Sequence, residues 1–195
     1  MADGEDLEEL ERTVTALAEA LFAASTVEGT LQEIVVLATD AVDGCDGAGV
    51  LVVDDAGTPT TAASTSEWVR ALDQAQIDLR EGPCLDAATS GSTVTATDLL
   101  VDERWPAFTA AVAGSGVRSV LALSLSAERL SALNLFAELP AAFGATDRAK
   151  GQLFATLARL ALDSAERQAL GEQRAGNLRA ALRSRELIGQ AQGIL

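Results

Sequence analysis

The chain has 195 residues, of which 48% are hydrophobic and 22% are charged, a composition typical of a globular protein with one main domain. No apolar run approaches the roughly 20 residues that a membrane span requires, and the acidic first six residues are unlike a signal peptide, so we expect a cytoplasmic protein with no membrane partner. The chain contains no His and only two Cys, which removes the usual general base and most metal sites. We therefore expect no catalytic residues, no metal and no cofactor.

Charge is distributed unevenly along the chain. Residues 1–165 contain 9 Lys and Arg against 26 Asp and Glu, a net charge of −17, whereas residues 166–195 contain 5 against 3, a net charge of +2. With a net charge of −17, residues 1–165 are expected to repel phosphate groups. Any contact with RNA is therefore expected from the C-terminal segment alone.

The first 25 residues are predicted to form a helix with a heptad seam. Apolar residues recur at alternating steps of three and four between residues 5 and 24: Leu7, Leu10, Val14, Leu17, Leu21 and Ala24. Such a seam packs against a partner helix, either in a second copy of the chain or in its own domain, and the run is too short to decide between them. We interpret residues 1–25 as an N-terminal dimerisation helix.

The middle of the chain alternates helix and strand signals. Thr26 and Ser66 are typical N-cap residues, and Gly57 ends a hairpin connection between two strands. The expected elements are helix 26–42, strands 47–53 and 59–64, helix 66–76, strand 93–97, helix 102–113, strands 117–125 and 130–139, and a helix from Asp147 to at least Arg167. Gly171 and Gly176 predict a linker or kink after that last helix.

Among the candidate residues, Cys84 has the side chain most capable of a chemical reaction. Gly82 and Pro83 form a good helix start, which would place Cys84 in a first turn where the helix dipole favours thiolate, although Glu81 and Asp86 oppose that shift. Cys84 is a redox candidate on this argument. The other interpretation, a small buried hydrophobic residue, remains open because free Cys is among the most buried residue types.

Five segments together resemble a GAF domain of the subgroup that is fused to ANTAR domains in actinobacterial regulators: residues 81–87, 98–99, 102–108, 116–123 and 132–136. The resemblance covers residues 27–165, with departures at Ser124 and in the short turn 126–129. It implies an α+β fold, with a GAF-like antiparallel sheet flanked by helices, an N-terminal helix and a long C-terminal helix.

The resemblance also implies a ligand position, between the sheet and a cap built from residues near 66–90 and 98–108. The ligand-pocket candidates are Trp68, Cys84, Trp105, Phe108, Leu121, Leu123 and Asn134. These residues suit an unknown small organic molecule or a closed core. Asn134, in an otherwise apolar strand, could equally be a satisfied core amide.

The end of the chain resembles the opening of an ANTAR domain, the RNA-binding output module of bacterial antitermination regulators. The resemblance lies in residues 181–185, 188–191 and 193–195, with Gln192 where that family commonly has Lys. We expect residues 166–195 to be a helical linker and the start of an ANTAR domain that breaks off, so that only the full-length protein binds RNA hairpins. A plain dimerising helix remains the alternative. The basic residues Arg179, Arg183 and Arg185 would flank the RNA surface or form a solvated helix face.

Two functions follow from these observations. The first is a signal-sensing regulator without enzymatic activity, a homodimer through its terminal helices, whose GAF domain controls transcription antitermination by the ANTAR module. The second is a Cys-dependent redox sensor, or an enzyme similar to the GAF-type free methionine sulfoxide reductases with Cys84 as nucleophile. That enzyme needs a resolving thiol, and Cys45 has no evident reach to Cys84.

Overall fold

The computed structural model describes residues 26–53, 56–126 and 130–192. The chain forms two compact units, Met1–Ala161 and Leu162–Leu195. The predicted dimerisation helix, residues 1–25, lies outside the described residues.

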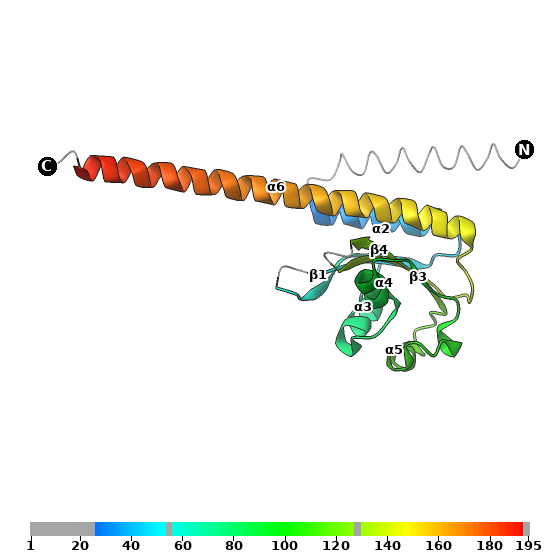
Figure 1. Ribbon diagram of the computed structural model, residues 1–195. Helices are drawn as coiled ribbons and strands as arrows, with labels where there is room; N and C mark the ends of the chain where they lie inside the picture. The colour runs from blue at the N-terminus through cyan, green and yellow to red at the C-terminus, as the bar shows by residue number, and fades with distance from the viewer. Residues whose placement is uncertain (1–25, 54–55, 127–129, 193–195) are drawn as a thin grey trace, which may run out of the picture. The chain divides into compact units, whose positions relative to one another are not determined.

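The first unit is built on a five-stranded antiparallel sheet (Figure 1). The strand order is β2-β1-β5-β4-β3, so the last two strands of the sequence occupy the centre. The strands are β1 (Gly47–Val53), β2 (Pro59–Ser64), β3 (Val94–Ala96), β4 (Ser119–Ser126) and β5 (Ser131–Ala137). All seven residues of β5 are buried, because β5 has a strand on each side and helices over both faces. The predicted α+β class is confirmed.

One face of the sheet is covered by α2 (Val27–Ala41) and by the first part of α6 (Ala145–Gln192) (Figure 1). The predicted cap of α2 is confirmed, since the Gly29 amide donates to Thr26 Oγ1 at 3.1 Å. Gly151 of α6 lies directly over the sheet: a Cβ added there would be 3.2–3.4 Å from side-chain atoms of three leucines in β4 and β5. The two helices and the sheet therefore share one apolar layer.

The opposite face is covered by shorter elements, which we call the cap. They are α3 (Glu67–Leu79), α4 (Pro83–Ser90), the 3-10 turn η1 (Leu99–Val101) and α5 (Pro106–Val112). An apolar cluster joins α3 and α5 to the sheet, with Val69, Leu72, Trp105, Phe108, Val120 and Phe136 among its members. The cap thus has its own core, separate from the layer under α2 and α6.

Three helices depart most clearly from the sequence prediction. α3 continues past Gln76 to Leu79. The predicted helix 102–113 begins only at Pro106, because the Asp102 carboxylate accepts a hydrogen bond from the Arg104 amide at 3.1 Å and so holds a local turn. α6 runs through Gly171 and Gly176 without a break, since one Gly costs a helix only about 1 kcal/mol.

Among the helices that the structure describes, none is long and apolar enough to cross a membrane.

Candidate functional site

A cluster of polar side chains lies buried between the cap and the sheet. α3 contributes Asp73 and Gln76, α4 contributes Cys84 and β5 contributes Asn134; the side chains of all four residues are fully buried. Asp73 and Gln76 follow Val69 at helical spacings of four and seven, so both point inward with the apolar face of α3. We call these four residues the polar cluster.

Hydrogen bonds connect the polar cluster across 61 residues of sequence. Asn134 Nδ2 donates to Asp73 Oδ1 at 2.8 Å and lies 2.8 Å from Cys84 Sγ. The backbone amide of Cys84 donates to Gln76 Oε1, also at 2.8 Å. Because a backbone N–H can only donate, its bond determines the orientation of the Gln76 side-chain amide.

Three polar atoms of the cluster have no hydrogen-bond partner within the described residues: Asp73 Oδ2, Gln76 Nε2 and Asn134 Oδ1. Most buried polar groups in proteins are paired, because an unpaired one costs about 1–3 kcal/mol. Three such atoms in one cluster therefore make it the candidate site of the domain.

Burial changes the acidity of two members of the cluster. Burial raises the pKa of Asp73 to about 7. The hydrogen bonds from Asn134 and Thr61 and the positive charge of Arg70 lower this pKa, but their effect is smaller than that of burial. Burial and the nearby charge of Asp73 raise the pKa of the Cys84 thiol well above its ordinary value, although the hydrogen bond from Asn134 lowers it. Cys84 is therefore a neutral thiol under ordinary conditions, contrary to the thiolate that a helix start would favour.

Two glycines make room for the polar cluster. A Cβ on Gly49 of β1 would lie 2.7 Å from Asp73 Oδ2, so this carboxyl oxygen lies directly over the Gly49 backbone. Gly82 has φ +145°, a conformation that side chains disfavour, and a Cβ there would overlap the Gln76 amide. The sheet and the α3–α4 connection are both shaped around these two polar side chains.

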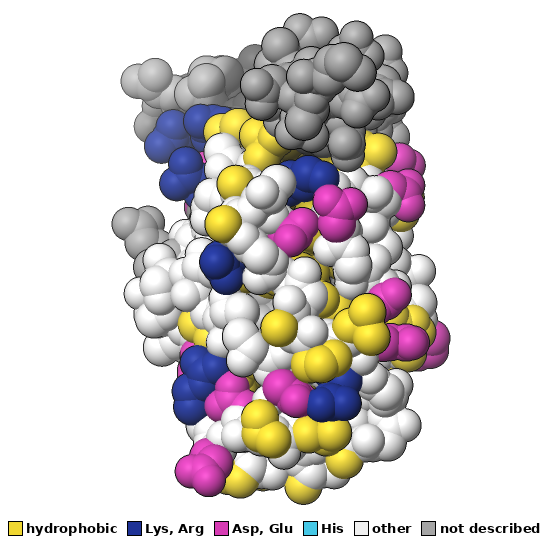
Figure 2. All heavy atoms as spheres, turned by 90° about the vertical axis from the view of Figure 1, so that its right-hand side faces the viewer, with side chains coloured by type: hydrophobic (Ala, Val, Ile, Leu, Met, Phe, Trp, Pro, Cys, Tyr) yellow, Lys and Arg dark blue, Asp and Glu magenta, His cyan; other side chains and the backbone are white. Residues whose placement is uncertain are grey.

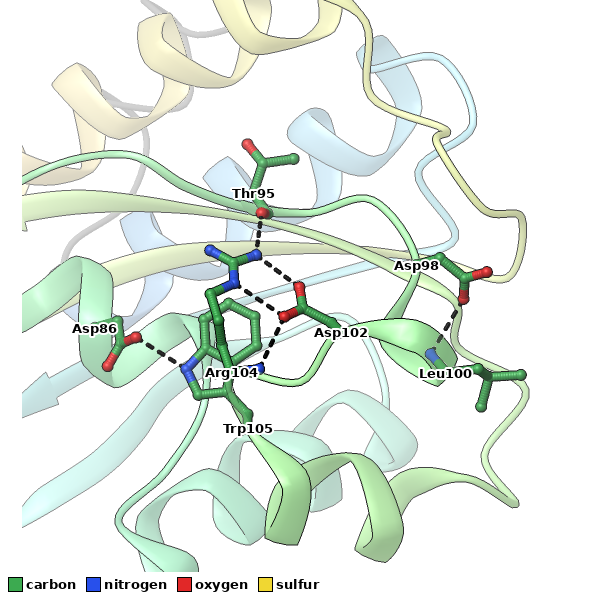
Figure 3. Close-up of polar contacts among 7 residues, drawn as sticks. All are labelled: Asp86, Thr95, Asp98, Leu100, Asp102, Arg104 and Trp105. Atoms are coloured by element: carbon green, nitrogen blue, oxygen red, sulfur yellow. Dashed lines mark hydrogen bonds and ion pairs between the residues drawn. The ribbon is translucent and has the colours of Figure 1, made fainter.

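A second group of polar contacts holds the rim of the cap together (Figure 3). Trp105 Nε1 donates to Asp86 Oδ2 at 2.9 Å and joins α5 to α4. Arg104 lies over the Trp105 ring at 4.1 Å, pairs with Asp102, and donates to the Thr95 carbonyl at 2.7 Å (Figure 3). Asp86, considered above as a charge beside Cys84, thus has a partner in the indole.

The structure brings five of the seven ligand-pocket candidates to the cap side of the sheet. Cys84 and Asn134 are in the polar cluster, Trp105 and Phe108 are buried in the apolar cluster of the cap, and Trp68 stands edge-on to Phe136 at 6.2 Å with 37% of its surface exposed.

The other two candidates lie elsewhere. Leu121 and Leu123 alternate with Val120 and Ala122 along β4 and face Gly151 of α6 on the opposite side of the sheet. The structure therefore does not bring them together with the other five.

The remaining sequence candidates fall outside the first unit. Arg179, Arg183 and Arg185 lie within α6, beyond the part of the chain whose side chains the structure describes. Sequence analysis missed Asp73 and Gln76, although two polar residues at buried positions of an amphipathic helix were a usable signal. Within the described residues no three His, Cys, Asp or Glu side chains are grouped to hold a metal ion.

A five-stranded antiparallel sheet, with a helical cap on one face and with α2 and the first part of α6 on the other, defines the GAF type of α+β domain. A family model described as the GAF domain matches residues 24–163, and the chain belongs to this family, whose members are signal-sensing domains found in regulators.

Solved structures with the same fold include sensors and enzymes. The GAF domain of a phosphoenolpyruvate-protein phosphotransferase from Coxiella burnetii is 15% identical (TM-score 0.64; 84% of this chain and 98% of that chain covered). The free methionine-R-sulfoxide reductase from Neisseria meningitidis, in complex with its substrate, is 19% identical (TM-score 0.62; 80% and 91%). The GAF domain of the cyanobacteriochrome TePixJ is 18% identical (TM-score 0.60; 75% and 94%). At these identities the similarity shows the fold alone, and no curated protein matches the chain.

Proposed function

We propose that this chain is a regulatory sensor whose GAF domain controls a C-terminal ANTAR-type, RNA-binding antiterminator module. The observation that carries the proposal is the position of β5 between the two helical layers. Asn134 of β5 binds the cap through Asp73 and Cys84, while its neighbour Leu135 points to Gly151 of α6. A signal that moves the cap therefore acts on α6 through one strand.

The proposed control of an RNA-binding module rests on the sequence in the last part of α6. This helix contains residues 181–192, most of the segment that resembles the start of an ANTAR domain. A change in the packing of α6 on the sheet biases the conformation of the output module attached to this helix. Such a mechanism shifts the populations of two conformations. The signal would be a small molecule bound under the cap, where three polar atoms have no partner.

RNA binding is expected from the output module and not from the sensor. Residues 1–165 have a net charge of −17, and on the face seen in Figure 2 basic side chains lie next to acidic ones. Such a surface does not attract a phosphate backbone.

A gel-shift experiment with a pool of short RNA hairpins tests this function. The sensor unit, Met1–Ala161, is expected to leave the RNA unshifted, whereas a version extended through a complete ANTAR bundle shifts it. Replacement of Arg179, Arg183 and Arg185 by Ala in the extended version is the matched control and is expected to weaken binding. Equal binding by both versions, or none by the extended one, would overturn the proposed output.

The reductase-like alternative fits the geometry less well. Catalysis by Cys84 needs an accessible thiol of low pKa, but Cys84 is fully buried with a raised pKa. The second thiol is no better suited, because burial raises the pKa of Cys45 to about 11. We therefore propose a sensor without enzymatic activity.

A further inference from the structure

Two of the unpartnered atoms in the polar cluster belong to groups that already share a hydrogen bond. Asn134 Nδ2 donates to one oxygen of Asp73, at 2.8 Å, while the other oxygen, Asp73 Oδ2, and the amide oxygen, Asn134 Oδ1, have no partner. A carboxyl group and a carboxamide group are both planar forks of two polar atoms. Two such forks can form a cyclic pair of hydrogen bonds, in which the remaining atom of one faces the remaining atom of the other.

Both of these remaining atoms are acceptors as long as Asp73 is ionised. Two buried acceptors cannot satisfy each other, and together they leave the charge of Asp73 without a direct cationic partner. A single proton resolves this conflict: Asp73 Oδ2 becomes an O–H donor, Asn134 Oδ1 accepts from it, and both orphaned atoms are paired at once.

We propose that Asp73 and Asn134 form a proton-dependent connection between cap and sheet, in which a proton taken from solvent by Asp73 Oδ2 closes a second hydrogen bond to Asn134 Oδ1. Release of that proton returns a negative charge to the buried carboxyl, breaks the second bond, and leaves α3 joined to β5 by one bond instead of two. The inference rests on the proposed sensor function for its biological use, whereas the pair itself is a property of the GAF domain.

The surroundings of Asp73 agree with a bound proton. The groups that face it are the Thr61 hydroxyl from β2, the charge of Arg70 from α3, the neutral thiol of Cys84 from α4 and the amide of Asn134 from β5. β1 offers only the Gly49 backbone at this point. Burial outweighs these polar contacts and raises the pKa of Asp73 to about 7, so the proton exchanges close to neutral pH.

The connection has a predictable effect on stability. Because the pKa of Asp73 is higher in the folded protein, about 7, than the ordinary 3.8 of an unfolded chain, the folded state binds the extra proton between these values. The stability that the proton supplies is complete below pH 3.8 and is lost as the pH rises to about 7. For one proton, the unfolding equilibrium constant rises by up to about tenfold per pH unit in that window.

Asp73→Asn provides the test, because an amide at this position donates and accepts as the protonated acid does. Unfolding by urea is measured between pH 4 and 8 for wild type and variant. The wild-type unfolding constant is expected to rise relative to that of the variant up to about pH 7 and to level off above it. Asp78→Asn, on the exposed side of the same helix, is the matched control and is expected to follow the wild type.

Parallel curves for wild type and Asp73→Asn would overturn the proposal. Carbon-13 NMR of the Asp73 carboxyl in the wild-type chain decides the question even if the variant fails to fold. A titration midpoint near 7 is expected, and a midpoint below 5 would overturn the proposal. Neither measurement involves RNA or a ligand, so failure here leaves the proposed output function untouched.

Discussion

Cys84 illustrates how strongly the surroundings of a residue can outweigh its position in a helix. The first turn of α4 would favour a thiolate, but complete burial and the neighbouring Asp73 raise the pKa of this thiol well above its ordinary value. The Asn134 amide is the one group that lowers it. In the folded protein, Cys84 is a buried, neutral thiol in contact with the Asn134 amide.

This environment predicts slow chemistry at Cys84. In a Cys45→Ser variant, which leaves one thiol, iodoacetamide at pH 7.5 is expected to label the native protein only as fast as it unfolds, since the reagent needs an exposed thiolate. Intact mass measured over time gives the rate, and labelling in urea gives the unfolded reference. Labelling of the native protein at the rate of an unfolded thiol would restore the redox-sensor and reductase alternatives.

At the scale of single elements, the sequence correctly predicted features that depend on neighbouring residues, such as helix caps and a hairpin. Thr26 and Ser66 cap α2 and α3 as expected, and the hairpin of β1 and β2 follows its turn residues. These features depend on neighbours within a few residues. The start of α5 was predicted wrongly, because the turn at Asp102 that delays it competes with the helix.

The arrangement of the site was less predictable than its elements. Asn134 pairs with Asp73 from a position 61 residues away, and no local pattern encodes that contact. Leu121 and Leu123 share a face of β4 because side chains alternate along a strand, but which face meets the cap depends on how β4 pairs within the sheet. Asp73 and Gln76 could have been found, because both interrupt the apolar face of α3.

At the scale of the whole molecule, we propose that two copies of the chain pair through helices at their ends. The predicted heptad seam in residues 1–25, outside the described residues, and α6 would supply the helices of a homodimer. Leu10→Asp together with Leu17→Asp is expected to yield monomers, because two charges in an apolar seam prevent its burial. Light scattering after size exclusion measures the mass. An unchanged mass profile would remove the predicted N-terminal helix from the interface.

The central claim is that the cap and α6 are coupled through β5. Asn134→Leu keeps a side chain of similar size but removes both bonds to Asp73 and Cys84. Val112→Ala in α5 is the control, since it loosens the apolar cluster of the cap without touching the polar cluster. Each variant is compared with wild type by hydrogen exchange, which reports local opening.

Hydrogen exchange in residues 145–161 of α6 reports whether the state of the cap reaches this helix. Coupling through β5 predicts that Asn134→Leu accelerates exchange both in α3 and α4 and in this segment of α6, whereas Val112→Ala accelerates it in the cap alone. If Asn134→Leu changes α3 and α4 and leaves residues 145–161 as protected as in wild type, β5 does not transmit the state of the cap.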